Sequence, residues 1–307
     1  MLTVNAIRFS YLKKPTIHLS SFSLQKGMNL AIIGESGCGK STLLKLIYGL
    51  YDVDEGHIFW NTIEVLGPKF NLIPGMEFMK YLAQDFDLMP YITVAENVGK
   101  YLSNTNALAK KRRILELLDT VEMAELANTK AQFLSGGQMQ RVAIAMVLAL
   151  EPEVLLLDEP FSHIDNFRKN SLRRKLFAYL KAKQITTLVA THDSTDVLSF
   201  ADEVLVMRNG EIIEKGTPNL LYKNPVNKYV ASLFGDVNEM DVDGKKAFIF
   251  PHQLKVVAVS DLKVVVVNSY FRGSYYLIEA QSENGILFFE SQQNHSKFEV
   301  IYLKNKP

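Results

Sequence analysis

The stretch Leu30-Ala31-Ile32-Ile33-Gly34-Glu35-Ser36-Gly37-Cys38-Gly39-Lys40-Ser41 decides the fold of this chain. Its first four residues form an apolar run that predicts a buried parallel strand. From Thr42 to Tyr48 apolar residues recur at helical spacing, and Gly49 ends that predicted helix. A strand, a glycine-rich loop and a helix in this order form a phosphate-binding loop.

The side chains of such a loop have distinct tasks. Its glycines let backbone N–H groups turn toward phosphate oxygens, and the positive end of the helix faces them. Lys40 is placed to reach the β- and γ-phosphates of a nucleotide, and the Ser41 hydroxyl to bind Mg²⁺. We therefore predict that ATP and Mg²⁺ bind here, with the nucleotide contacted by Gly34, Glu35, Ser36, Gly37, Cys38, Gly39, Lys40, Ser41 and Thr42.

A second apolar strand, residues 154–157, ends in two carboxylates, Asp158 and Glu159. A buried strand would hold Asp158 rigidly toward the metal. Glu159, the next residue, would then be placed to accept a proton from an attacking water molecule. The alternative, an acidic turn at the end of a strand, explains the motif only if the phosphate-binding loop is ignored.

The chain has a single cysteine, Cys38, which excludes an internal disulfide framework and fits a reducing compartment. We expect Cys38 to contribute its backbone N–H to the phosphate-binding loop. A redox role is the weaker interpretation, although the neighbouring lysine and helix terminus favour a lowered thiol pKa.

The turn Leu134-Ser135-Gly136-Gly137-Gln138 opens another predicted helix and makes a second candidate anion site. One nucleotide does not need two separate anion sites on the same face. We therefore expect this turn to reach a phosphate that another subunit holds.

With these motifs the chain resembles the ATP-binding cassette (ABC) ATPases, and Ser135, Gly136, Gly137 and Gln138 correspond to their signature sequence. The resemblance implies two cassettes packed head to tail. Each ATP is then sandwiched between the phosphate-binding loop of one subunit and the signature turn of the other. This chain carries one set of motifs, so the second cassette must come from another chain, in a homodimer by preference.

The same resemblance assigns roles to four further residues. Gln84 matches a glutamine that touches Mg²⁺ and the attacking water, and His192 matches a histidine that contacts the γ-phosphate. Asp165 matches an aspartate that crosses the dimer interface, although His163 stands where the family more often has Ala or Asn. Tyr11 matches the aromatic ring that stacks on adenine, with Phe9 as a near competitor.

Composition changes along the chain predict two domains. Residues 1–237 read as an α/β nucleotide-binding domain with a P-loop fold and a helical subdomain at about 86–150. Residues 238–307 consist of short β-branched and aromatic runs separated by Asp243-Gly244, Arg272-Gly273 and Asn284-Gly285. They predict a small all-β, barrel-like domain.

That β domain resembles the oligonucleotide/oligosaccharide-binding (OB) type accessory domain of many ABC importer ATPases. The stretches 89–98, 216–225 and 249–254 carry the resemblance. It implies a partnership with membrane permease subunits and a substrate-binding protein, at the cytoplasmic face of the inner membrane. Among the importer types, those for iron(III) and polyamines are the most similar.

Charge and hydropathy exclude other classes. A net charge of +1 gives no broad basic surface for nucleic acid, and the basic run 110–113 reads as a solvated helix face. No apolar run reaches the roughly 18 residues that a spanning helix needs, and the N-terminus does not read as a signal peptide. The competing hypothesis is a soluble ABC ATPase that acts on nucleic acid or ribosomes, which the near-neutral charge disfavours.

Overall fold

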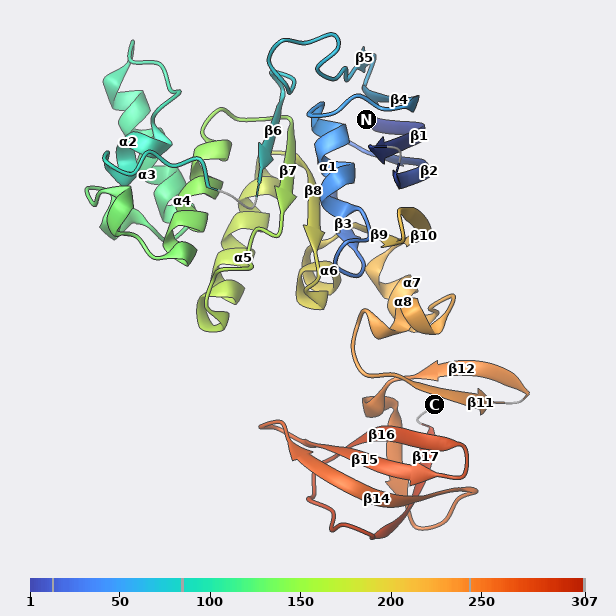
Figure 1. Cartoon of the computed structure of the whole chain (residues 1–307). Coiled ribbons are helices and arrows are strands. Elements are labelled where there is room, and N and C mark those ends of the chain that lie inside the picture. Colours follow the sequence, from blue (N-terminus) through green and yellow to red (C-terminus); the bar gives the residue numbers. More distant parts are fainter. Residues whose placement is uncertain (13, 84–85, 243, 306–307) are drawn as a thin grey trace. The chain divides into compact units, whose positions relative to one another are not determined.

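The structure is a computed structural model that describes residues 1–12, 14–83, 86–242 and 244–305. It divides into two compact units, Met1–Pro218 and Asn219–Pro307 (Figure 1). The first unit is mixed α/β and the second is built mainly from antiparallel strands. The predicted architecture, an α/β domain followed by a small β domain, is confirmed.

A six-stranded sheet in the order β10-β9-β3-β8-β7-β6 forms the centre of the first unit. Its neighbours are parallel except for the pair β9–β10. Because parallel sheets are covered on both faces, β3, β7 and β8 are buried throughout. The strands are β3 (Asn29–Ile33), β6 (Met79–Leu82), β7 (Val154–Asp158), β8 (Thr186–Thr191), β9 (Glu203–Arg208) and β10 (Glu211–Gly216).

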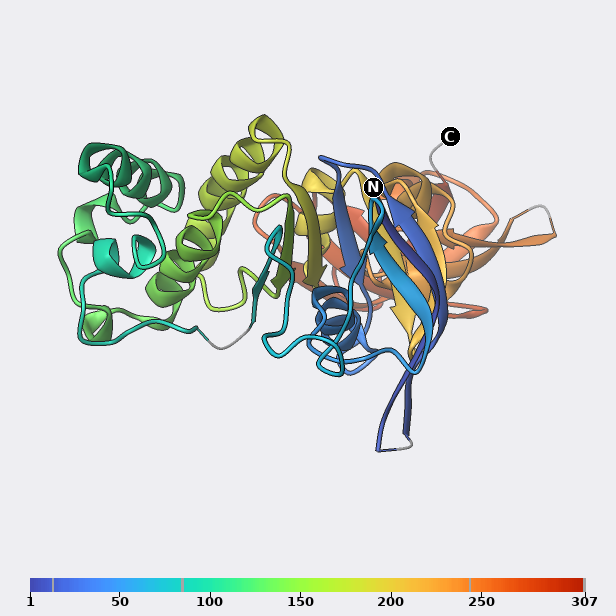
Figure 2. The same cartoon turned by 90° about the horizontal axis from the view of Figure 1, so that it is seen from above.

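The residues of β7 alternate between two hydrophobic cores. Val154 and Leu156 share one core with α1 (Lys40–Tyr48), whereas Leu155 and Leu157 share the other with α4 (Gly136–Leu148) and α5 (Asn166–Ala182). Successive residues of a strand point to opposite faces of the sheet. The phosphate-loop helix and the α4–α5 pair therefore cover opposite faces, as Figure 2 shows.

A four-stranded antiparallel sheet, in the order β2-β1-β4-β5, packs on the α1 side of the central sheet. Trp60 and Leu2, which face each other across two of its strands, are fully buried in that core. The strands are β1 (Leu2–Tyr11), β2 (Lys14–Leu24), β4 (Glu55–Trp60) and β5 (Ile63–Glu64).

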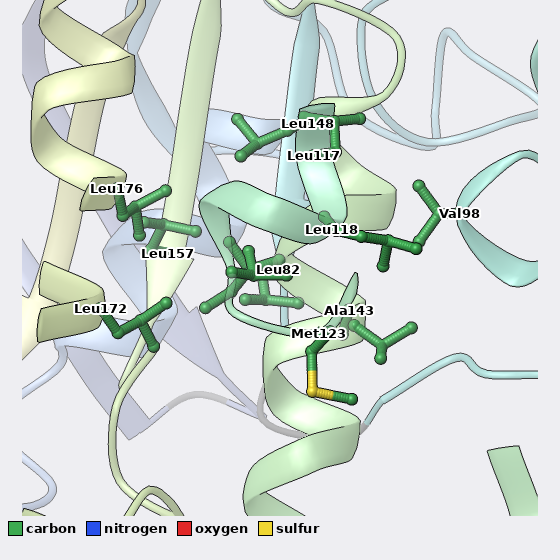
Figure 3. Packing of buried hydrophobic residues seen from close by; sticks show 14 of the residues in the cluster. Leu82, Val98, Leu117, Leu118, Met123, Ala143, Leu148, Leu157, Leu172 and Leu176 are labelled. Atoms are coloured by element: carbon green, nitrogen blue, oxygen red, sulfur yellow. The ribbon is translucent and has the colours of Figure 1, made fainter. Parts of the chain in front are cut away.

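Helices between β6 and β7 form a helical region against the other core. They are α2 (Val94–Val98), α3 (Ala107–Thr120), η1 (Ala124–Leu126), η2 (Ala131–Phe133) and α4. Leu117 and Leu118 of α3 meet the α4 and α5 leucines in one apolar layer (Figure 3). None of the helices in the described ranges is both long and apolar enough to span a bilayer.

The second unit contains α8 (Lys228–Ser232), most of α7 (Pro218–Lys223), a β11–β12 hairpin and a five-stranded antiparallel sheet. The sheet has the order β13-β17-β14-β15-β16, and its edge strands β13 and β16 contact each other, so it curls in the predicted barrel-like manner. Ile278 and Phe289 lie at the centre of its core. The remaining bounds are β11 (Asn238–Val242), β12 (Lys245–Ile249), η3 (Pro251–Gln253), β13 (Leu254–Val257), β14 (Leu262–Phe271), β15 (Tyr276–Ser282), β16 (Gly285–Ser291) and β17 (Val300–Asn305).

The two compact units divide after Pro218, which is earlier in the chain than the domain boundary predicted between residues 237 and 238. The reason is visible in an aromatic contact: the ring of Tyr222 on α7 stacks on Phe250 with centroids 4.4 Å apart. Residues 219–237 therefore group with the β domain by contact. The boundary at 237/238 and the helical subdomain at about 86–150 stay predictions about how the family divides its domains.

Candidate functional site

The glycine-rich loop lies between β3 and α1, as predicted. Gly34 has no room for a side chain, because a Cβ there would lie 2.2 Å from the Met207 carbonyl oxygen. Gly39 takes a left-handed conformation, with φ +110°, where it begins α1. The Lys40 ammonium donates to the Gly34 and Glu35 carbonyls at 2.8 and 3.0 Å. This lysine is only 8% exposed, so its charge is held inside the loop.

Cys38 is buried within the same loop, and its thiol would be the neighbour of any side chain at Gly34. Burial raises the pKa of the Cys38 thiol, and the nearby Lys40 charge only partly opposes that rise. The expectation of a lowered pKa is therefore wrong, because desolvation of the thiolate outweighs attraction to the lysine.

Asp158 at the end of β7 meets the loop directly. The Ser41 hydroxyl donates to Asp158 Oδ1 at 3.0 Å, and the Tyr81 hydroxyl donates to Asp158 Oδ2 at 3.2 Å. Burial, together with the Asp158 charge, raises the pKa of Tyr81, so the phenol keeps its proton and acts as a donor. Sequence reasoning missed Tyr81, because its partner lies 77 residues away on the neighbouring strand.

Glu159 and His192 lie side by side after β7 and β8. The His192 Nδ1 atom is 2.9 Å from Glu159 Oε1 and 2.8 Å from Oε2. The Glu159 backbone has φ 52°, and its N–H donates to the Ala190 carbonyl, which fixes a conformation that side-chain-bearing residues seldom adopt. The His192 side chain is 67% exposed, whereas Glu159 is 15% exposed.

A buried ion pair network fixes the turn that carries His192. Arg173 of α5 pairs with Asp193 and Asp196, and Thr191 donates to Asp196. Burial alone would raise the pKa of Asp193, but hydrogen bonds from Arg173 and Thr195 hold it below its usual value. Burial raises the pKa of Asp196 despite Arg173. Sequence reasoning did not single out Arg173 or Thr191. Their ion pairs and hydrogen bonds form only when α5 lies next to the start of α6 (Ser194–Phe200).

The signature turn forms the start of α4. Ser135 accepts from the Gln138 N–H at 3.4 Å, and the Ser135 N–H donates to the Gln138 side chain at 2.8 Å, which makes a capping box. Space around Gly136 is open to 4 Å, whereas a Cβ on Gly137 would lie 2.6 Å from the His163 carbonyl. The first-turn N–H groups make no intrahelical bond.

Buried Gln140 joins α4 to Glu159, the residue that follows β7, a contact that sequence reasoning missed. Its side-chain NH₂ donates to the Glu159 carbonyl at 2.8 Å, and its oxygen accepts from the His163 N–H at 3.1 Å. The unusual His163 ring packs edge-on against Phe86 of the helical region.

Two separate hollows are lined by many of the predicted site residues. One, of about 230 Å³, is lined by loop residues with Asp158 and Glu159; the full lining is Thr16, Ser36, Gly37, Gly39, Lys40, Ser41, Thr42, Asp158 and Glu159. The other, of about 370 Å³, brings Ser135, Gly136, Gly137 and Gln138 together with Asp165. The two linings share no residue.

Among the described residues, five predicted site residues line neither of these hollows: Tyr11, Gly34, Glu35, Cys38 and His192. Tyr11 packs edge-on against Phe9 and Tyr51, and it is 37% exposed whereas Phe9 is 8% exposed. Tyr11 is thus the ring of the two that is accessible. Gln84 lies outside the described residues.

Comparison with known proteins assigns the family. Residues 17–162 match the ABC transporter family. The Fe(3+) ions import ATP-binding protein FbpC of Pseudomonas fluorescens is 38% identical over 237 residues, which cover 76% of this chain and 66% of that protein. FbpC 2 of Haemophilus influenzae, with the same description, is 34% identical over 238 residues, covering 77% of this chain and 67% of that protein. The chain belongs to the ABC transporter family.

Other relatives of this ABC chain have different cargo in their names. The spermidine/putrescine import ATP-binding protein PotA of Salmonella typhimurium is 36% identical over 244 residues, covering 78% of this chain and 63% of that protein. Matches to these three relatives span 63 to 67% of their lengths.

Solved ABC cassettes share the fold. A dimeric post-hydrolysis state of the ATP-binding cassette MJ0796, bound to ADP and Pi, aligns with a TM-score of 0.62 at 27% identity, over 71% of this chain and 99% of that one. CbiO1 of Clostridium perfringens, part of the ABC transporter complex cbiONQ, aligns with a TM-score of 0.64 at 27% identity, over 73% of this chain and 90% of that one.

Proposed function

We propose that this ABC chain is the ATP-hydrolysing subunit of an importer. The observation that carries the proposal is the hollow in which Lys40, Ser41, Asp158 and Glu159 converge, while the signature turn occupies another hollow of the same chain. A phosphate-binding loop next to a carboxylate pair supplies the parts for phosphoryl transfer to water. The relatives whose names describe import ATP-binding proteins support the direction of transport.

Mg²⁺ fits the first hollow. The donors there are oxygens, from the Ser41 hydroxyl and the buried Asp158 carboxylate, 3.0 Å apart. Among the described residues no three His, Cys, Asp or Glu side chains gather as a metal cage, and Mg²⁺ prefers one or two carboxylates completed by substrate phosphates and water. We propose Ser41, Asp158 and Gln84 as the residues that hold it. The ion would neutralise phosphate charge as a Lewis acid.

Glu159 is the proposed general base. His192 lies beside it and is proposed to contact the γ-phosphate. The His192 Nδ1 atom lies 2.9 Å from Glu159 Oε1, and Glu159 lines the hollow, where its carboxylate would meet an attacking water molecule. The exposed remainder of the His192 ring is free to face the transferred phosphate. Tyr11 and Thr42 would flank the rest of the nucleotide.

The signature hollow completes the site of a second subunit. Ser135, Gly136 and Gly137 offer a helix start to a phosphate, and Asp165 lies beside them for contacts across the interface. We propose a homodimer with two composite ATP sites that drives a membrane permease, with a substrate-binding protein, at the cytoplasmic face of the inner membrane. Iron(III) or a polyamine is the proposed cargo.

Uptake measurements test the proposal. Cells that make this chain are compared with cells that make Glu159→Gln in its place, for uptake of radiolabelled iron(III) and of spermidine. We expect uptake of one cargo to fall, and a multi-span membrane protein to copurify with the tagged chain. Unchanged uptake of both, with ribosomes or nucleic acid copurifying instead, would support the soluble alternative.

A further inference from the structure

Asp158 is a buried carboxylate that accepts one side-chain hydrogen bond on each oxygen from the described residues. It is 3% exposed, with the Ser41 hydroxyl on Oδ1 and the Tyr81 hydroxyl on Oδ2. A buried charge is costly unless it is hydrogen-bonded. These two hydroxyls therefore set the orientation of the Asp158 carboxylate at the end of β7.

The terminal torsion of an aspartate is soft and nearly two-fold, so packing of its Cβ does not fix which oxygen faces the metal. Ser41 is itself a proposed metal ligand and cannot serve as an independent anchor for the carboxylate. Tyr81 approaches from the opposite side, on β6, and takes the oxygen that Ser41 leaves. Of the two hydroxyls that the described residues bring to Asp158, the tyrosine is thus the one placed to orient the group.

The Tyr81 ring is itself held in place. Its strand pairs in parallel register with β7, with Tyr81 opposite Leu156, two residues before the aspartate. Its ring packs on Tyr48 of the phosphate-loop helix, with centroids 5.6 Å apart. The phenol therefore connects β6, β7 and α1, the three elements around the proposed metal.

We propose that Tyr81 is a positioning residue that holds Asp158 Oδ2 and so directs Oδ1 toward the metal beside Ser41. The inference rests on the proposed function, since it concerns the Mg²⁺ that would accompany ATP. Partners that orient a metal ligand typically contribute about 10- to 100-fold to metal affinity. The effect should appear in metal binding and leave metal-free nucleotide binding unchanged.

The test uses Tyr81→Phe, which removes the hydroxyl and keeps the ring. Mn²⁺ binding to the full chain with ATP is measured by electron paramagnetic resonance in a Glu159→Gln background, and metal-free nucleotide binding by fluorescence. We expect Mn²⁺ affinity to fall about tenfold, consistent with the loss of one orienting partner. Tyr48→Phe, which alters the neighbouring ring without touching Asp158, is the matched control and should change nothing.

A double-mutant cycle separates positioning from general damage. In an Asp158→Asn background, Tyr81→Phe should have a smaller effect on Mn²⁺ affinity, because the uncharged amide oxygen is a weaker acceptor for the Tyr81 hydroxyl. Equal Mn²⁺ affinity of Tyr81→Phe and the parent would overturn the inference about Tyr81. Failure of the parent chain to bind Mn²⁺ with ATP would instead overturn the proposed function.

Discussion

The two hollows of the cassette differ in how far their chemistry is built within one chain. Around the phosphate-binding loop three charged groups are held by neighbours: the buried Lys40 by loop carbonyls, the buried Asp158 by two hydroxyls, and the partly buried Glu159 by His192. At the signature turn Gly136 faces open space, and the Ser135 side chain serves a capping box. This difference fits our proposal that one hollow is preorganised for chemistry and that the other offers a helix start to a ligand held by a second subunit.

Of the single substitutions, Glu159→Gln in the hollow of the phosphate-binding loop should have the largest effect on ATP hydrolysis. An amide keeps the shape of the carboxylate and cannot take a proton, so we expect steady-state ATP hydrolysis to fall about 10²- to 10⁴-fold. Nucleotide affinity should stay the same and an ATP-bound dimer should persist on gel filtration. Glu153→Gln, the same change at the residue just before β7 and outside the lining of this hollow, is the control. Near-normal turnover would remove Glu159 as the base.

Lys40→Ala should weaken nucleotide binding in the same hollow. Hydrogen bonds to charged groups contribute about 1.5–3 kcal/mol, so ATP affinity should fall roughly 10- to 150-fold. Equilibrium titration with a fluorescent ATP analogue measures the change. Lys45→Ala, on the same helix and further from the loop, should bind as the parent does. Unaltered affinity of Lys40→Ala would contradict the assignment of the loop.

Gly136→Asp tests the hollow that the signature turn lines. Since Gly136 has open space around it, the side chain fits the fold and acts only on what faces the turn. A carboxylate there repels phosphate, so ATP-dependent dimerisation should weaken by about tenfold, equivalent to about 1.4 kcal/mol, while the monomer binds ATP normally. Sedimentation with ATP measures this. Gly136→Asn, of the same shape without the charge, should lose less; an equal loss would contradict the charge argument.

Sequence reasoning reached the parts of the site that are local along the chain. The order strand, glycine loop and helix at residues 30–48 and the strand ending at Asp158 are confirmed, because apolar runs and glycines act over a few residues. Tyr81, Gln140 and Arg173 escaped, since each meets its partner only when distant elements pack. The direction of the Cys38 thiol pKa also escaped, because the burial that raises it is not visible in the sequence.

Mixing two variants tests the composite site most directly. Lys40→Ala lacks a working loop and Gly136→Asp a working signature turn, each in a Glu159→Gln background so that bound ATP is retained. If each ATP site joins the loop of one subunit to the signature turn of the other, about half of the dimers formed by random pairing carry one intact site. ATP retained on a desalting column should then exceed the mean of the two separate variants. Retention equal to that mean would show that each site lies within a single chain.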